Sequence, residues 1–152
     1  MKKLTYLLTA GVLLAVLTIV GCKKDDGGGL SEEEEQLAAL TGTWAATSVN
    51  DGTTDRQDYD DFVLAINGSN QTYTTTGGPD LLPMPKAAPF EFGANVKTQL
   101  VLEPNNANTA VSYSISADGT ELTWSFSYTG DGFTNTRQSS VEGDWTFVFT
   151  KQ

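Results

Sequence analysis

The sequence predicts an all-β fold, a small antiparallel up-and-down barrel of seven or eight strands over residues 40–152. Three observations predict it. Apolar and polar residues alternate in one short segment after another, turn residues separate these segments, and helical periodicity is confined to a short stretch before the first strand. With 152 residues, the chain has room for one such domain.

The first residues predict a signal peptide over 1–21. Residues 1–3 carry two lysines, and residues 4–20 form an uncharged apolar run that is short for a membrane-spanning helix. The residues Ile19-Val20-Gly21-Cys22 resemble the lipobox of bacterial lipoproteins. That resemblance implies cleavage before Cys22 and lipidation of its thiol and new amine, so that acyl chains such as palmitate anchor the protein to a membrane. The alternative is an ordinary signal peptide, or an uncleaved anchor, with a chance cysteine.

A tether follows the lipidated cysteine. Residues 23–31 are charged and glycine-rich, which predicts flexibility. The sequence Lys23-Lys24-Asp25-Asp26 resembles the surface-export signals of Bacteroidota lipoproteins. The resemblance implies an outer-membrane protein, lipid-anchored and exposed at the cell surface. The alternative is a solvated tether that faces the periplasm.

A short helix is predicted over residues 32–40, so that residues 22–39 hold the lipidated cysteine, the tether and most of this helix. Ser31 and Glu34 have the spacing of a capping box, and the four glutamates of the first turn suit the helix dipole. Leu37 and Leu40 share one face of the helix, which we expect to cap the β domain. Helix content beyond this segment should be near zero.

The strands follow in order after Thr41. Asn67-Gly68 and Asp118-Gly119 are each flanked by strand-like segments and predict hairpin turns. Leu122, Trp124, Phe126 and Tyr128 alternate with hydroxyl residues, as in a strand with one buried face. The predicted strand segments are 44–49, 62–66, 71–75, 100–102, 111–116, 122–129 and 145–150.

Residues 77–89 contain four prolines, which predicts neither a helix nor a central strand. The segment nevertheless carries Leu81, Leu82 and Met84, which are costly to leave in water. It is therefore either a lid over the barrel mouth, a docking surface for a protein partner, or a long loop folded back over an open barrel end.

Several motifs together resemble a family. Gly42-Thr43-Trp44 resembles the Gly-x-Trp signature of lipocalins, and the chain is similar to a lipocalin-like family of Bacteroidota lipoproteins at residues 40–44, 59–62, 73–75 and 141–147. The resemblance implies an up-and-down barrel in which Trp44 closes one end under a basic residue. Arg137 and Lys151 are the candidates for that residue.

Gly143-Asp144-Trp145 repeats the pattern of Gly42-Thr43-Trp44 near the end of the chain. The repeat predicts that the first and last strands pair and close the sheet. Chance is the alternative, because glycine and tryptophan both mark strand starts.

A set of aromatic residues occupies alternate strand positions, where the side chains face inward. They either line a pocket for a small hydrophobic ligand or fill the core, since an eight-stranded barrel has room for one or the other. The candidate ligand-binding residues are Tyr73, Tyr113, Trp124 and Phe126, and Trp145 and Phe147 belong to the same set.

Composition argues against several function classes. The chain has no histidine, its single cysteine is Cys22, and its formal net charge is −10. We therefore expect no catalytic residues, no cofactor, no metal and no nucleic acid partner. Four carboxylates, at Asp55, Asp58, Asp60 and Asp61, either bind Ca²⁺ or form a solvated loop, and their spacing does not match a calcium-binding loop.

The leading hypothesis from the sequence is an outer-membrane lipoprotein whose lipocalin-like barrel binds a small hydrophobic ligand. The alternative is a structural or accessory subunit that docks a protein partner through residues 77–89. A lipid-handling or hydrolytic enzyme is the third hypothesis. A pocket left open by small inward residues favours the first, a packed interior with an exposed Leu81–Met84 patch favours the second, and inward carboxylates in a deep cleft favour the third.

Overall fold

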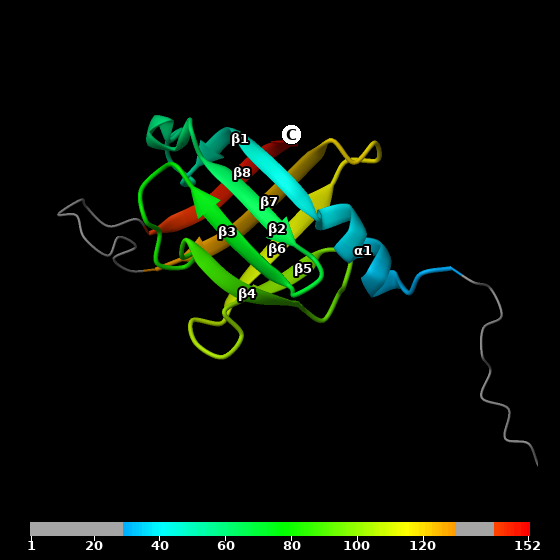
Figure 1. Cartoon of the computed structure of the whole chain (residues 1–152). Helices are drawn as coiled ribbons and strands as arrows, with labels where there is room; N and C mark the ends of the chain where they lie inside the picture. Colours follow the sequence, from blue (N-terminus) through cyan, green and yellow to red (C-terminus); the bar gives the residue numbers. More distant parts are fainter. Residues whose placement is uncertain (1–28, 130–141) are drawn as a thin grey trace, which may run out of the picture.

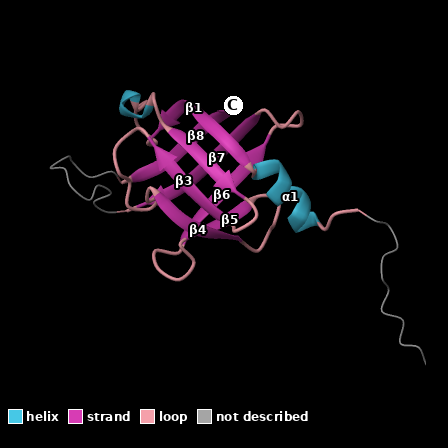
Figure 2. Ribbon diagram, in the orientation of Figure 1, coloured by secondary structure: helices cyan, strands magenta, loops and turns pink. Residues whose placement is uncertain are grey.

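The computed structural model describes residues 29–129 and 142–152, which form a closed antiparallel β-barrel with one short helix before its first strand (Figures 1 and 2). Neighbours in the sequence are neighbours in the sheet, and β1 pairs with β8 to close it. The predicted all-β, up-and-down fold is therefore confirmed, and the topology is consistent with a lipocalin-like barrel. The elements are α1 (Glu32–Leu40), β1 (Gly42–Asn50), η1 (Gln57–Tyr59), β2 (Val63–Asn67), β3 (Thr72–Thr76), β4 (Ala87–Phe92), β5 (Gln99–Leu102), β6 (Thr109–Ile115), β7 (Glu121–Tyr128) and β8 (Gly143–Lys151).

Helix α1 begins with the predicted capping box. The Ser31 hydroxyl accepts a hydrogen bond from the Glu34 amide, and the Glu34 side chain accepts one from the Ser31 amide. Leu40 is fully buried and Leu37 packs against the core, so the apolar side of α1 caps one end of the barrel as expected.

Strand β4 was not predicted, and the expectation of a loop over 77–89 is wrong for residues 87–89. Pro89 fits in β4 because its position needs no amide donor. The Glu103 amide donates to the Pro89 carbonyl at 3.0 Å, while the Glu103 carbonyl accepts from Asn106 and Asn108 instead. The short 3₁₀ helix η1 was also not predicted.

The barrel has two different ends because successive strands run in opposite directions. The helix end holds α1, the β2–β3, β4–β5 and β6–β7 turns and the C-terminus. The loop end holds the connections that follow β1, β3 and β5, together with the end of β7 and the start of β8, and Figure 1 shows the connections after β1 and β3 on the side opposite α1.

Large side chains fill the interior. Trp44, Trp124 and Trp145 are fully buried, and the rings of Trp145, Phe147 and Phe149 follow one another along β8 with centroids 5.9 Å apart. Each such side chain contributes roughly 1.5–3 kcal/mol through burial. The core therefore runs from one end of the barrel to the other.

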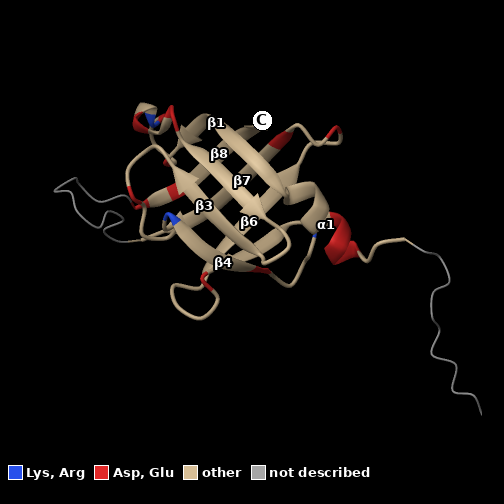
Figure 3. Ribbon diagram, viewed as in Figure 1, with Lys and Arg blue, Asp and Glu red and all other residues tan. Residues whose placement is uncertain are grey.

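Charged residues gather on α1 and in the connections at both ends, and the outer faces of the strands are mostly uncharged (Figure 3). Within residues 29–129 and 142–152, no helix has the length and hydropathy to cross a bilayer. The same residues bring no three Asp, Glu, His or Cys side chains together to hold a metal ion.

Candidate functional site

The helix end is closed by Trp44, Gly42 and Lys151. The Lys151 ammonium lies 4.9 Å from the centroid of the Trp44 ring and donates to the Ala39 carbonyl at 3.3 Å. The Trp44 indole nitrogen donates to the Leu40 carbonyl at 2.8 Å. Lys151 therefore stands over Trp44 in the place that the lipocalin resemblance implied for a basic residue, and the other candidate, Arg137, lies outside the described residues.

Tyr113 also belongs to the helix end. Its hydroxyl donates to the carbonyl of Val96 and to the side chain of Gln36 on α1, so the residue fastens the helix to the barrel. Burial raises the pKa of Tyr113 to about 12. This candidate ligand residue thus has protein partners for its polar atom and lies away from the loop end.

Tyr73 and Trp124 pack against each other in the buried core of the barrel. Their rings pack edge to face, with centroids 5.9 Å apart, and both side chains are buried. Burial, together with the negative charge of Glu103, raises the pKa of Tyr73. Among the described residues, neither the Tyr73 hydroxyl nor the Trp124 indole nitrogen has a hydrogen-bond partner.

One half of the loop end is closed by Arg56 and the aromatic rings beneath it. Arg56 lies over the Trp145 ring, 5.0 Å from its centroid, and over the Tyr59 ring at 5.5 Å. Two hydrogen bonds, of 2.9 and 2.7 Å, tie the Arg56 guanidinium to Asp58. Tyr59 and Phe62 are buried beneath this cover. This end therefore repeats the arrangement of a cation over the tryptophan of a Gly-x-Trp sequence.

The residues of the acidic cluster do not converge. Asp58 pairs with Arg56, and Asp55 accepts a hydrogen bond of 2.7 Å from Asn50. Asp60 is the exposed C-cap residue of η1, and Asp61 follows it in the turn. Asp55 and Asp58 therefore use their carboxylates in local contacts of this loop.

The proline-rich loop, residues 77–86, covers the rest of this half of the loop end. Leu81 and Met84 face each other in a tight turn and are both buried, whereas Leu82 between them is 42% exposed. An ion pair of 2.8 Å between Asp80 and Lys86 joins the two arms of the loop. Of the predicted Leu81–Met84 patch, only the tip at Leu82 is thus presented outward, while the rest folds back onto the barrel.

The other half of the loop end opens into a groove where β6 and β7 separate. The ladder between them ends at Ser112 and Ser125, although β6 extends back to Thr109 and β7 continues to Tyr128. Each strand keeps its other neighbour there, since Thr109 pairs with Leu102 of β5 and Tyr128 with Gly143 of β8. The resulting groove has a volume of about 940 Å³.

The groove is lined by residues that face both ways in the barrel wall. Ala110 and Ser127 are exposed positions of the outer face, while Phe126 belongs to the buried core. An intact wall presents one face only, so this mixture marks an interruption. The full lining is Leu82, Pro83, Glu103, Asn106, Ala107, Asn108, Thr109, Ala110, Ser112, Ser125, Phe126, Ser127, Tyr128, Thr129, Asp144, Trp145 and Thr146.

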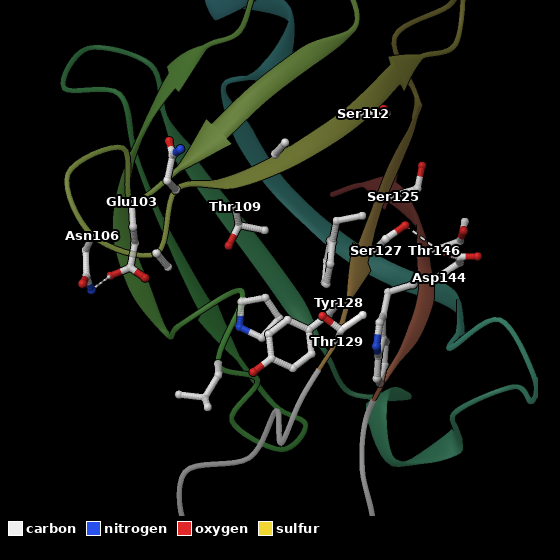
Figure 4. A pocket seen from close by; sticks show the side chains of 17 residues that line it. Glu103, Asn106, Thr109, Ser112, Ser125, Ser127, Tyr128, Thr129, Asp144 and Thr146 are labelled. Carbon is white, nitrogen blue, oxygen red and sulfur yellow. Dashed lines mark hydrogen bonds between the residues drawn. The ribbon is translucent and has the colours of Figure 1, made fainter.

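Polar groups flank the groove on both sides (Figure 4). Glu103 and Asn106, joined by a hydrogen bond of 3.3 Å, lie on one side, and Asp144, which accepts from the Ser127 hydroxyl at 2.5 Å, lies on the other. Glu103 and Asp144 are the two charged residues in the described lining, and none of that lining is basic. The groove therefore combines aromatic and aliphatic surface with hydroxyls and negative charge.

Only Phe126 of the four predicted ligand residues lines this groove. Tyr113 and Trp124 precede the point of separation along the β6–β7 ladder, where they pair directly, and Tyr73 lies in β3. The groove itself was missed because both strands keep their alternation through the separation. Comparison with known proteins finds no family model, no curated protein and no solved structure that matches this chain.

Proposed function

We propose that this protein is an outer-membrane lipoprotein, anchored through Cys22, whose barrel binds a small, largely hydrophobic ligand in the groove at the loop end. The anchor and its location rest on the lipobox and export-signal resemblances of residues 19–26. The binding site rests on one observation, the separation of β6 from β7 beyond Ser112 and Ser125.

The size and lining of the groove suit a small molecule. Its volume of about 940 Å³ lies within the range of ligand sites, which is roughly 300–1,000 Å³. Phe126, Leu82 and Pro83 supply apolar surface, and the hydroxyls of Thr109 and Ser127 supply polar contacts. We propose this groove rather than the barrel interior because the rings of Tyr73 and Trp124 pack against each other within the core.

The alternative, a subunit that docks a protein partner through residues 77–89, finds less support. Leu81 and Met84 are turned into the barrel, which leaves Leu82 as the exposed apolar side chain of the loop. One exposed leucine is ordinary on a monomer surface. Leu82 instead contributes to the rim of the groove.

Native mass spectrometry of the intact lipoprotein, extracted from its own membrane in detergent, tests the proposal. We expect a discrete small-molecule adduct on the wild-type protein and its loss in the variant Ser127→Trp, which fills the groove from an exposed position. Ser114→Trp is the matched control, because Ser114 is an exposed position of β6 outside the groove lining. An adduct that survives Ser127→Trp, or that is absent from the wild type, contradicts a ligand site in this groove.

A further inference from the structure

The hydrogen-bonding edges of β6 and β7 face each other across the groove. In β6, the Ser116 amide donates to the Glu121 carbonyl, and the Tyr113 amide donates to the Thr98 carbonyl. The backbone amides and carbonyls of even-numbered residues in β6 therefore point toward β7, and those of odd-numbered residues point toward β5. In β7, the Thr120 carbonyl accepts from the Lys151 amide. The backbone amides and carbonyls of even-numbered residues in β7 therefore point toward β8, and those of odd-numbered residues point toward β6.

This alternation identifies the backbone groups that the separation leaves without a cross-strand partner. A continued ladder would join Ala110 to Ser127, and the β6–β7 register stops before this pair. Both residues are exposed, and both line the groove. Two strand edges with unused amides and carbonyls form a template for an added strand.

From this geometry we infer that the ligand of the groove is a short extended peptide, which adds a strand between β6 and β7. The inference rests on the proposed function, because it names the chemical class of the ligand at the same site. Three residues of each strand, 109–111 and 126–128, extend past the paired region. They match about 10 Å of extended chain, or about three to four peptide residues.

The two faces of the wall define which side chains the peptide carries. Every second side chain points toward Phe126 and the buried interior and is therefore apolar. The side chains between them point outward, where Asp144 flanks the groove and Glu103 lies across from it. With two acids in the described lining and a chain charge of −10, basic outward residues are favoured and acidic ones are disfavoured.

Hydrogen exchange with a defined peptide tests the inference. The probe is an acetylated, amidated hexapeptide of alternating lysine and valine, added to the intact lipoprotein in phosphatidylcholine nanodiscs. We expect the Ala110 and Ser127 amides to exchange more slowly by on the order of tenfold or more, because they gain hydrogen-bond partners. The Ser114 amide, which already belongs to the β6–β7 ladder, serves as the internal reference.

A second peptide, methylated on alternate amide nitrogens along one edge, isolates the backbone contribution. We expect its affinity to fall on the order of tenfold or more, since one row of donors is removed. Asp144→Asn should weaken the lysine peptide several-fold and leave a serine–valine peptide unchanged, which tests the charge preference. Empty nanodiscs measure the binding of the peptide to lipid.

The outcomes separate the inference from the proposed function. Absence of peptide binding to the protein, equal binding of the methylated peptide, or binding without protection of Ala110 and Ser127 overturns strand addition. If these results accompany a small-molecule adduct that Ser127→Trp removes, the groove is still a ligand site and only the peptide class is wrong. If Ser127→Trp and Ser114→Trp retain an adduct equally and the peptide does not bind, both proposals fail.

Discussion

The Lys151 ammonium lies 4.9 Å above the Trp44 ring, and the lysine stem passes 3.0 Å from where a Cβ on Gly42 would be. This spacing explains the Gly-x-Trp sequence physically. Gly42 has a φ of +144°, which disfavours any other residue, and its missing side chain is the space that the lysine stem occupies. Lys151 of the last strand, β8, thereby packs against the start of the first strand, β1.

Gly42→Ala should lower the free energy of unfolding by about 1–3 kcal/mol, because the new methyl group combines backbone strain with displacement of Lys151. Urea unfolding of the variant measures this loss. Gly119→Ala is the control, since Gly119 also has a positive φ but has nothing within 4 Å of the added Cβ. Equal losses in the two variants would show that the contact with Lys151 has no effect.

Removing the charge of Lys151 should also destabilise the protein. Lys151→Met keeps most of the stem but loses the cation over Trp44 and the hydrogen bond to Ala39, so we expect a loss of about 0.5–2 kcal/mol. Lys86→Met provides the comparison, because Lys86 makes an exposed ion pair with Asp80 that should contribute at most about 1 kcal/mol. Chemical denaturation of both variants should rank Lys151 as the more important; the reverse order would contradict a stabilising cation.

Two tyrosine-to-phenylalanine substitutions should have different effects on the free energy of unfolding. Tyr73→Phe removes a buried hydroxyl that lacks a partner among the described residues, so stability should stay equal or rise by about 1 kcal/mol. Tyr113→Phe removes hydrogen bonds to Gln36 and Val96 and should cost about 1 kcal/mol. Thermal unfolding distinguishes them. A clear loss for Tyr73→Phe would reveal a bound water or ligand atom at that hydroxyl.

Alkaline pH should weaken the fold. Burial raises the pKa of Tyr113 from its ordinary value of 10.0 to about 12, so the folded protein holds this proton more tightly than the unfolded chain does. The contribution of Tyr113 to stability is therefore fully present below pH 10 and is lost as the pH rises toward 12. Urea midpoints at a series of pH values should show this decline, with a smaller slope in Tyr113→Phe. An unchanged slope would assign the decline to other groups, such as the buried Tyr73 and Tyr59.

Cys22→Ser should abolish attachment of acyl chains and leave the protein outside the membrane lipid fraction, because the hydroxyl cannot replace the thiol in the proposed lipidation. Metabolic labelling with palmitate, followed by mass analysis of the N-terminus, measures this. Gly21→Ala keeps a small residue at the cleavage position and should still be labelled. Labelling that persists in Cys22→Ser would refute the lipoprotein assignment.

Local patterns predicted those parts of the fold that local contacts determine. The alternation of Leu122, Trp124 and Phe126 identified β7, and Ser31 with Glu34 identified the start of α1. Strand β4 was not predicted because a proline such as Pro89 ordinarily argues against an internal strand. Pro89 fits in the sheet because the Glu103 carbonyl accepts hydrogen bonds from other residues. That arrangement involves residues distant in sequence, which no local pattern records.

The candidate site depends on such distant relationships even more. Val111 and Phe126 are buried as their alternation predicts, so nothing in either segment marks the end of the shared ladder. Beyond the end of that ladder each strand keeps its partner on the other side, β5 for β6 and β8 for β7, and these pairings involve residues outside both segments. Aromatic residues could therefore be assigned to the interior from sequence. Predicting the opening beside Phe126, in contrast, requires knowing how all the strands of the barrel pair.

The placement of α1 has a consequence for how the domain is presented. The chain from Cys22 enters the domain at Ser31 and α1, and the C-terminal Lys151 lies at this same end. In a protein anchored through Cys22, that end is the membrane-proximal pole. The groove between Glu103 and Asp144 opens at the distal pole, where β5 and β7 end and β6 and β8 begin. With the proposed anchor, a molecule arriving from the surrounding medium would meet the open side of the barrel before it meets the bilayer.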